Sequence, residues 1–231
     1  MIDANKVKYF WEMRGEQFSK IPFESIANLE ENPELLALKV KIETEQVLPR
    51  LQLHDRLTIL DLGAGVGQWA FRFAPHVKSV TAVEYSKSLA NIGIKKLHDN
   101  KIDNVKFVIS PAENFNTNEL FDVIFVSGLF VYMNDDQVEK LIPKFSKWVK
   151  QGGIVFLRDG VSILNIRHCI KDNFSSVLKT NYSALYRTRD EYVNLFACND
   201  FSLIEDRQMF DEGCPLNKYP ETRLWYYIFR R

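Results

Sequence analysis

The chain has 231 residues, 46% of them hydrophobic, so it is long enough to bury the core of one domain. Its 30 lysines and arginines balance its 30 aspartates and glutamates, which excludes an overall field that attracts nucleic acid or an anionic membrane surface. It contains no apolar stretch that could span a bilayer, no secretory signal pattern and three widely spaced cysteines, so we expect a cytoplasmic protein with free thiols.

The first 56 residues predict a helical cap. Residues 7–18 are aromatic and amphipathic, and residues 34–53 carry leucine and isoleucine at helical spacing. From residue 58 onward, short apolar runs alternate with segments of helical character at residues 86–100 and 135–149. The runs are TILDL, SVTAVE, VKFVIS, FDVIFV and GGIVFLRD. This alternation predicts a doubly wound α/β fold, in which helices cover both faces of a parallel sheet.

The last part of the chain predicts an insertion followed by two closing strands. We expect a helical insertion at residues 161–177, a polar aromatic stretch at residues 179–188 and a helix at residues 190–197. FSLIEDRQMF and RLWYYIFRR are the predicted strands. The second is so aromatic that exposure to water would be costly, so we expect it inside the sheet.

A glycine-rich loop follows the first strand in ILDLGAGVGQWAFRF. Gly63, Gly65 and Gly67 permit positive φ and let backbone amides approach a ligand that a β-carbon would push away. The stretch from Gly65 to Ala70 also satisfies the loose dinucleotide pattern GxGxxA, so the loop alone indicates a nucleotide-type site. Asp61 beside the loop would repel a pyrophosphate, yet it can receive the ammonium of a methionine moiety.

The run Asp-Leu-Gly-Ala-Gly-x-Gly resembles the first motif of class I S-adenosylmethionine-dependent methyltransferases, and the resemblance covers residues 58–159. It implies a Rossmann-like seven-stranded sheet that is mostly parallel, with an antiparallel last strand. It also implies S-adenosylmethionine as cofactor, S-adenosylhomocysteine as product, and a small molecule or saccharide as acceptor. The cofactor-binding residues that follow from the loop and the resemblance are Asp61, Gly63, Ala64, Gly65, Gly67, Glu84, Tyr85, Ala112, Glu113, Ser127, Gly128 and Trp11.

Three of these positions have competing interpretations. Glu84 ends the second strand, where methyltransferases and dinucleotide enzymes alike place an acid that accepts ribose hydroxyls. Glu113, in SPAENF, matches an acidic residue near the adenine amine but could instead only cap the next turn. Trp11, in KYFWEMRGEQF, would close over the cofactor together with Tyr9 and Arg14, or be part of an aromatic core stripe.

The acceptor half is harder to identify, because methyl transfer needs alignment and removal of a proton rather than dedicated machinery. Arg158 and Asp159 leave the fifth strand at the edge where open α/β sheets bind ligands, as a charged pair for an acceptor or a plain salt bridge. His168 is a candidate general base or a packing residue. Tyr186 and Arg187 resemble an acceptor-lining loop of class I enzymes that act on phospho-bases, sugars or glycan ends. The catalytic candidates are Asp159, His168, Arg158, Tyr186 and Arg187, with Tyr132 and Tyr182 beside them.

We therefore predict one domain with a helical cap (1–56), a cofactor-binding core (57–160) and an acceptor-lining insertion with closing strands (161–231). The predicted reaction is methyl transfer to a hydroxyl or another polar nucleophile of a small molecule or saccharide, including acceptors whose phosphate or carboxylate the arginines would recognise. The alternatives are N-methylation of a small amine, an NAD-dependent oxidoreductase, and a partner protein that binds the cofactor without catalysis. We expect no metal and no nucleic-acid partner, since Ser-Gly-Leu-Phe replaces the Asn/Asp-Pro-Pro-Tyr/Phe signature after the fourth strand.

Overall fold

Three helices open the chain in the computed structural model, which describes residues 1–16, 22–28, 30, 32–175 and 180–231. They are α1 (Ala4–Glu16), α2 (Phe23–Asn28) and α3 (Pro33–Arg50). The side chain of Asn32 accepts two backbone N–H groups at the start of α3, where a proline occupies the first turn. The N-terminal helices are thus confirmed. Residues 17 and 18, the end of the first predicted helix, lie outside the described residues.

The rest of the chain alternates strands and helices as the apolar runs predicted. The elements in order are β1 (Thr58–Leu62), α4 (Gln68–Phe73), η2 (Ala74–His76), β2 (Ser79–Glu84), α5 (Lys87–Asp99), β3 (Val105–Ile109), η3 (Ala112–Asn114), β4 (Phe121–Ser127), η4 (Phe130–Tyr132), α6 (Asp135–Trp148), β5 (Val149–Ser162), β6 (His168–Ser175), β7 (Thr180–Thr188), α7 (Arg189–Ala197), β8 (Ser202–Gln208) and β9 (Thr222–Arg230).

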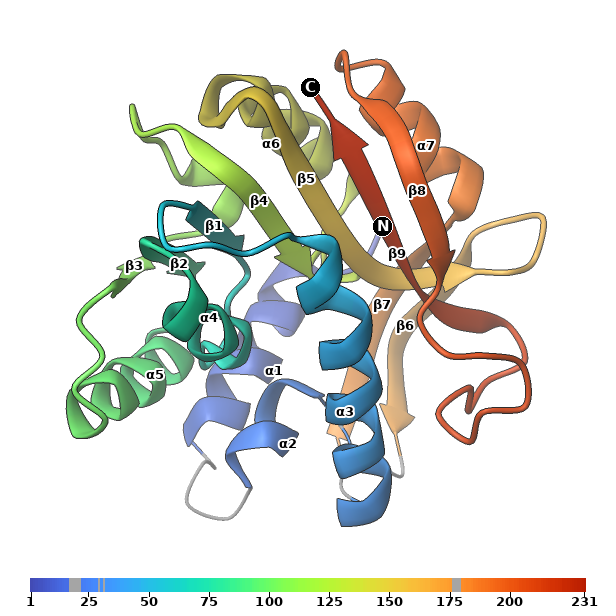
Figure 1. The fold of residues 1–231 in the computed structure, drawn as a ribbon. Coiled ribbons are helices and arrows are strands. Elements are labelled where there is room, and N and C mark those ends of the chain that lie inside the picture. Colours follow the sequence, from blue (N-terminus) through green and yellow to red (C-terminus); the bar gives the residue numbers. More distant parts are fainter. Residues whose placement is uncertain (17–21, 29, 31, 176–179) are drawn as a thin grey trace.

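The sheet has the predicted mixed topology. Strands β3, β2, β1, β4 and β5 pair side by side and run parallel. The C-terminal strand β9 pairs antiparallel with β5 over Ile154 to Ser162, and β8 pairs antiparallel with β9. Figure 1 shows β9 between β5 and β8, so the aromatic last strand lies inside the sheet as expected. The Rossmann-like α/β fold is confirmed, but the sheet of the described residues has nine strands rather than the expected seven, because β6 and β7 extend it.

Residues 161–177 do not form the predicted helical insertion. Strand β5 continues to Ser162, and β6 and β7 then form an antiparallel hairpin. Strand β7 also pairs with Val161 and Ser162 of β5, beyond the point where β4 ends. This segment extends the sheet through the pairing of β7 with β5 and of β6 with β7. These tertiary contacts outweigh the weak helical pattern of its apolar residues. Residues 176, 177 and 179 lie outside the described residues.

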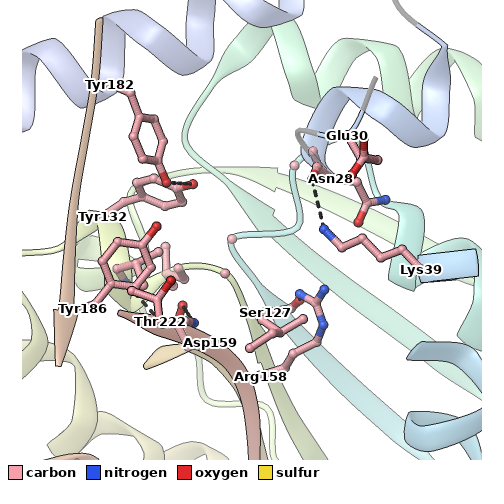
Figure 2. A pocket seen from close by; sticks show the side chains of 18 of the residues that line it. Asn28, Glu30, Lys39, Ser127, Tyr132, Arg158, Asp159, Tyr182, Tyr186 and Thr222 are labelled. Carbon is pink, nitrogen blue, oxygen red and sulfur yellow. Dashed lines mark hydrogen bonds between the residues drawn. The ribbon is translucent and has the colours of Figure 1, made fainter. Parts of the chain in front are cut away.

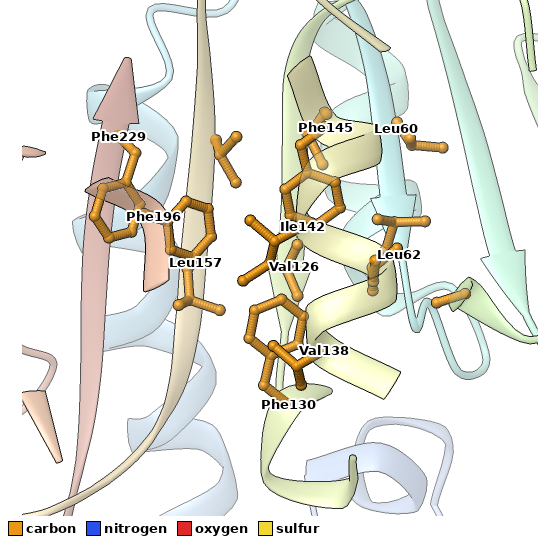
Figure 3. Packing of buried hydrophobic residues seen from close by; sticks show 14 of the residues in the cluster. Leu60, Leu62, Val126, Phe130, Val138, Ile142, Phe145, Leu157, Phe196 and Phe229 are labelled. Carbon is orange, nitrogen blue, oxygen red and sulfur yellow. The ribbon is translucent and has the colours of Figure 1, made fainter. Parts of the chain in front are cut away.

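Two apolar clusters hold helices on opposite faces of the sheet. Helices α6 and α7 pack on one face, where Phe145 and Phe196 meet strand residues such as Leu157 (Figure 3). Helices α3, α4 and α5 pack on the other face, where Phe73 contacts Phe125. Because both faces are covered, the central strands are apolar on both sides, and the free space lies at their carboxyl ends.

Candidate functional site

A cavity of about 700 Å³ opens at the carboxyl ends of β1, β2, β4 and β5. This volume is typical of small-molecule sites. Its other walls come from α1, the segment joining α2 to α3, the β6–β7 hairpin and the loop between β8 and β9. The cavity therefore lies at the sheet edge where doubly wound folds bind their ligands.

Two buried carboxyl groups stand behind the glycine loop. Glu84 accepts the backbone N–H of Gly65 at 2.8 Å with one oxygen and that of Ser86 at 2.8 Å with the other. Burial raises the pKa of Glu84 to about 7. Burial and the charge of Glu84 raise the pKa of Asp61 to about 7 as well. One oxygen of Asp61 is buried without a hydrogen-bond partner among the described residues, so it suits a ligand that brings a donor or a positive charge.

The backbone beside these carboxyl groups leaves room for a ligand. The loop glycines at positions 63, 65 and 67 all have positive φ, as the sequence predicted. Gly128, after β4, also has positive φ, and a β-carbon there would meet no atom within 4 Å. With the unpaired oxygen of Asp61, this cradle fits a ligand with an ammonium group and a nucleoside.

The structure places most, but not all, of the expected cofactor residues in this cavity. Its lining includes Trp11, Asp61, Gly63, Ala64, Gly65, Glu84, Tyr85, Ser127 and Gly128. Gly67, Ala112 and Glu113 are outside the lining. The carboxylate of Glu113 accepts a hydrogen bond from Gln137 of α6 at 2.8 Å, so this residue ties two segments together rather than facing the cavity.

The N-terminal aromatic segment contributes one residue to the site. Trp11 packs edge-on against Tyr132, with ring centroids 5.2 Å apart. Tyr9 is 68% exposed, and Arg14 is buried and donates to the backbone carbonyls of Ser25 and Ile26. These two residues therefore do not close over a cofactor as we had expected.

Three tyrosines face the cavity from η4 and the hairpin, and we call Tyr132, Tyr182 and Tyr186 the tyrosine wall (Figure 2). The hydroxyls of Tyr132 and Tyr182 lie 3.0 Å apart. Burial raises the pKa of all three side chains well above the ordinary value, so their hydroxyls stay neutral. A β-carbon on Gly160 would lie 2.7 Å from the ring of Tyr186, so glycine lets this ring lie against β5.

Asp159 and Arg158 line the cavity but do not form the expected pair. Neighbouring strand residues point to opposite faces. Arg158 forms an ion pair with Glu43 of α3 and donates to Ser127 Oγ at 2.9 Å. Asp159 accepts hydrogen bonds from the backbone N–H groups of Val131 and Gly160 at 3.1 and 2.9 Å.

Asp159 and His168 are the candidate proton acceptors of this half. Burial raises the pKa of Asp159 to about 6, against the lowering effect of its backbone hydrogen bonds. The ring of His168 lies 5.9 Å from that of Tyr186, between centroids, and also lines the cavity. Both side chains are therefore placed where an acceptor could be deprotonated.

The prediction that Arg187 contacts the methyl acceptor is wrong. Its side chain has no exposed surface and lies outside the cavity lining. The guanidinium donates to the backbone carbonyls of Phe130 and Met133 at 2.9 and 3.0 Å and pairs with Asp135 at 2.7 Å. The guanidinium is thus directed at η4, which carries Tyr132, and at the start of α6, and it does not face the cavity.

The opposite side of the cavity is polar and charged, and sequence reasoning missed most of it. We call this set the charged wall; it consists of Asn28, Glu30, Lys39, Arg158 and Lys218. Figure 2 shows Lys39 and Arg158 across the cavity from the tyrosine wall. Apart from Arg158, these residues lie on helical or loop segments with no motif, so nothing in their pattern indicated a site.

Within the described ranges, no group of three or more His, Cys, Asp or Glu side chains could hold a metal, and no helix could cross a membrane.

Residues 59–153 match the family model described as a methyltransferase domain. Phosphoethanolamine N-methyltransferase 3 of Arabidopsis thaliana is 36% identical over 125 residues, which cover 52% of this chain and 24% of that protein. (S)-coclaurine N-methyltransferase of Papaver somniferum is 32% identical over 112 residues, or 48% of this chain and 31% of that protein. The chain thus spans less than a third of the length of these relatives.

Solved structures share the fold across nearly the whole chain. Phosphoethanolamine N-methyltransferase 1 of Haemonchus contortus, in complex with phosphoethanolamine and S-adenosylhomocysteine, has a TM-score of 0.73 at 16% identity and covers 98% of this chain and 50% of its own. A SAM-dependent methyltransferase of Leishmania major has a TM-score of 0.72 at 16% identity, covering 98% and 82%. The likeness at this identity is one of fold.

Proposed function

We propose that this chain, which belongs by its residues 59–153 and its fold to the class I methyltransferases, transfers a methyl group from S-adenosylmethionine to the nitrogen of a small polar amine. One observation carries the proposal. The tyrosine wall and Asp159 line the same cavity as the glycine loop, Asp61 and Glu84. A nucleoside-binding half and a half rich in hydrogen-bond acceptors therefore face one another in a single space.

The cofactor half has a distinct task for each group. The unpaired oxygen of Asp61 would accept the cofactor's ammonium, and the remaining lone pairs of Glu84 would accept the ribose hydroxyls. Gly128 would let the ligand approach the end of β4. When bound, S-adenosylmethionine supplies a methyl carbon activated by its positive sulfur.

The acceptor half suits an amine. A nitrogen attacks with its lone pair, so it must be neutral and aimed at the methyl carbon. The neutral hydroxyls of Tyr132 and Tyr186 can accept N–H bonds and orient such a nitrogen. Asp159, with a pKa of about 6, is mostly ionised at neutral pH and can receive the proton that the amine must lose.

Names of the relatives agree with an amine rather than with the sugar hydroxyl that the sequence led us to place first. Relatives that match about half of this chain are named as phosphoethanolamine N-methyltransferases and as (S)-coclaurine N-methyltransferase. An alcohol would also need a stronger base, because its proton is far less acidic than that of an ammonium ion. His168 is the side chain that would have to supply such a base.

The test measures methyl transfer from labelled S-adenosylmethionine to amine and sugar acceptors. We would incubate the purified protein with ethanolamine, phosphoethanolamine, precursors of N-methylated alkaloids and free monosaccharides, and identify the products by mass spectrometry. N-methylated product that disappears in Asp159→Asn supports the proposal. Product from sugars alone would return the function to O-methylation, and saturable binding of NAD without S-adenosylmethionine would exclude both.

A further inference from the structure

Lys39 stands apart from the other charges of the charged wall. Lys218 pairs with Glu30 at 2.5 Å, and Arg158 pairs with Glu43. The ammonium of Lys39 donates to the backbone carbonyl of Asn28 at 3.0 Å and makes no ion pair in the part of the chain that the structure describes. A lysine ammonium carries three donors, so two are left for a ligand in the cavity that this side chain lines.

The surroundings of Lys39 favour a negative partner. Burial lowers the pKa of Lys39 to about 8; the nearby charge of Arg158 acts in the same direction, and the charges of Glu43 and Glu30 act against it without overcoming the effect of burial. Lys39 therefore remains mostly protonated at neutral pH, in a place where its charge is poorly solvated and faces another cation. A negatively charged group between the two side chains would relieve both costs, because poorly solvated charges are stable only when they are paired.

We propose that Lys39, with Arg158 beside it, forms an oxyanion subsite that binds a carboxylate or phosphate of a ligand in the cavity. The inference rests on the proposed function, since it takes the ligand to be the cofactor or the acceptor. Arg158 keeps unpaired capacity of its own, because its Nε is buried without a partner. The subsite lies across the cavity from the tyrosine wall (Figure 2), so a ligand could place its anion on one side and its amine on the other.

Two molecules could bring this anion, namely the carboxylate of the cofactor or an anionic group of the acceptor. The first arm of the test measures, by calorimetry, the binding of S-adenosylhomocysteine and of its decarboxylated analogue, which lacks only the carboxylate. Loss of a hydrogen bond to a charged group should weaken binding by about tenfold to a hundredfold. If the cofactor supplies the anion, Lys39→Met shows this loss for S-adenosylhomocysteine but not for the analogue.

The second arm uses inorganic phosphate as the probe, added to protein saturated with S-adenosylhomocysteine. If the acceptor supplies the anion, Lys39→Met binds the cofactor product normally and weakens phosphate binding by the same factor. Lys39→Arg should restore binding in either arm, because it keeps the charge. Neither arm needs turnover, so the two proposals are tested separately. The oxyanion subsite can be supported even if the acceptor is not an amine, and N-methylation of an amine can be supported even if the subsite is overturned.

Lys41 provides the matched control. It lies on α3 with an exposed side chain and does not line the cavity, so Lys41→Met makes the same change on the same helix. Methionine and lysine have similar helix propensities, and thermal melting of each variant would verify folding, with Lys39→Gln as a second variant. Equal affinities of wild type, Lys39→Met and Lys41→Met for S-adenosylhomocysteine and phosphate would overturn the subsite.

Discussion

The two halves of the cavity are built in different ways. The cofactor half comes from the ends of neighbouring parallel strands, and its groups are held by backbone contacts such as the Gly65 N–H that Glu84 accepts. The acceptor half is assembled by side chains from distant segments. Tyr132 and Tyr182, which share a hydrogen bond, lie 50 residues apart, and Arg187 donates to the carbonyl of Phe130 across 57 residues.

The fold itself sets the positions of the cofactor-binding groups, whereas individual side-chain contacts set the positions of the acceptor-binding groups. Any chain that forms these parallel strands places the ends of β1 and β2 at one edge, so the cofactor half follows from the fold. The acceptor half depends on a few buried polar contacts that join η4, the hairpin and α6. We therefore expect substitutions to affect one half while leaving the other intact.

The largest effect should come from Arg187→Met, which removes the support of the acceptor half. The buried carbonyl of Met133 would lose its donor, at about 1–3 kcal/mol, and Asp135 would lose its charged partner, while the carbonyl of Phe130 would keep only the N–H of Met133. We expect the free energy of unfolding to fall by about 3 kcal/mol, measured by chemical denaturation. Affinity of the folded protein for S-adenosylhomocysteine should persist.

Arg189→Met is the control for that experiment. Arg189 lies two residues away and pairs with Asp206, but its side chain is 44% exposed. Exposed ion pairs contribute about 0–1 kcal/mol. Equal losses of stability in the two variants would mean that Arg187 does not hold the acceptor half together.

Asp61→Asn should break the cofactor half alone. The amide keeps the shape of the side chain but loses the charge that would receive an ammonium, a contact of about 2 kcal/mol or thirtyfold in affinity. Calorimetry with S-adenosylhomocysteine checks this, and Asp103→Asn, an exposed change before β3, is the control. Unchanged affinity in Asp61→Asn would remove Asp61 from the cofactor site.

Changing the pH should affect the cofactor half in two opposite ways, because Asp61 lowers the stability of the free protein and raises its affinity for the cofactor as pH rises. Burial raises the pKa of Asp61 to about 7 from 3.8, so between pH 4 and 7 the folded protein holds a proton that the unfolded chain has released. Stability of the free protein from this group therefore falls as pH rises through that window. Affinity for the ammonium of S-adenosylhomocysteine should instead rise, by about tenfold from pH 6 to 8, as the carboxylate ionises.

Both trends are read as differences between wild type and Asp61→Asn, at each pH, from denaturation curves and calorimetry. The nearby Glu84 titrates in the same range, so the two groups act as a coupled pair in wild type. A cofactor affinity that is flat across pH 6 to 8 in wild type would contradict an Asp61 that is protonated in the free protein and loses its proton when the ammonium binds.

The same contrast explains how far the sequence could be interpreted. Asp61, the loop glycines and Glu84 stand in a fixed spacing along one strand–loop–helix–strand unit, so their placement follows from local pattern. The hairpin was mistaken for a helix because its apolar residues fit either period over a short run. Arg187 was assigned to a ligand because its chemistry suits an anion, yet its burial against carbonyls is a tertiary fact. Lys39 carried no signal at all, since a lysine on a helix is usually a solvated residue.

The smallest effect should come from Tyr186→Phe, which changes one hydroxyl of the acceptor half. The ring remains against Gly160, so packing is kept and the loss is limited to the neutral hydrogen bonds of one hydroxyl, to Tyr182 and to the acceptor, or about fivefold in kcat/KM for the amine. Binding of S-adenosylhomocysteine should not change, because the hydroxyl belongs to the half built by the hairpin. Tyr9→Phe, on an exposed side chain, controls for the substitution itself. A matching loss of cofactor affinity in Tyr186→Phe would show that the two halves are coupled, and that the tyrosine wall also shapes the cofactor half.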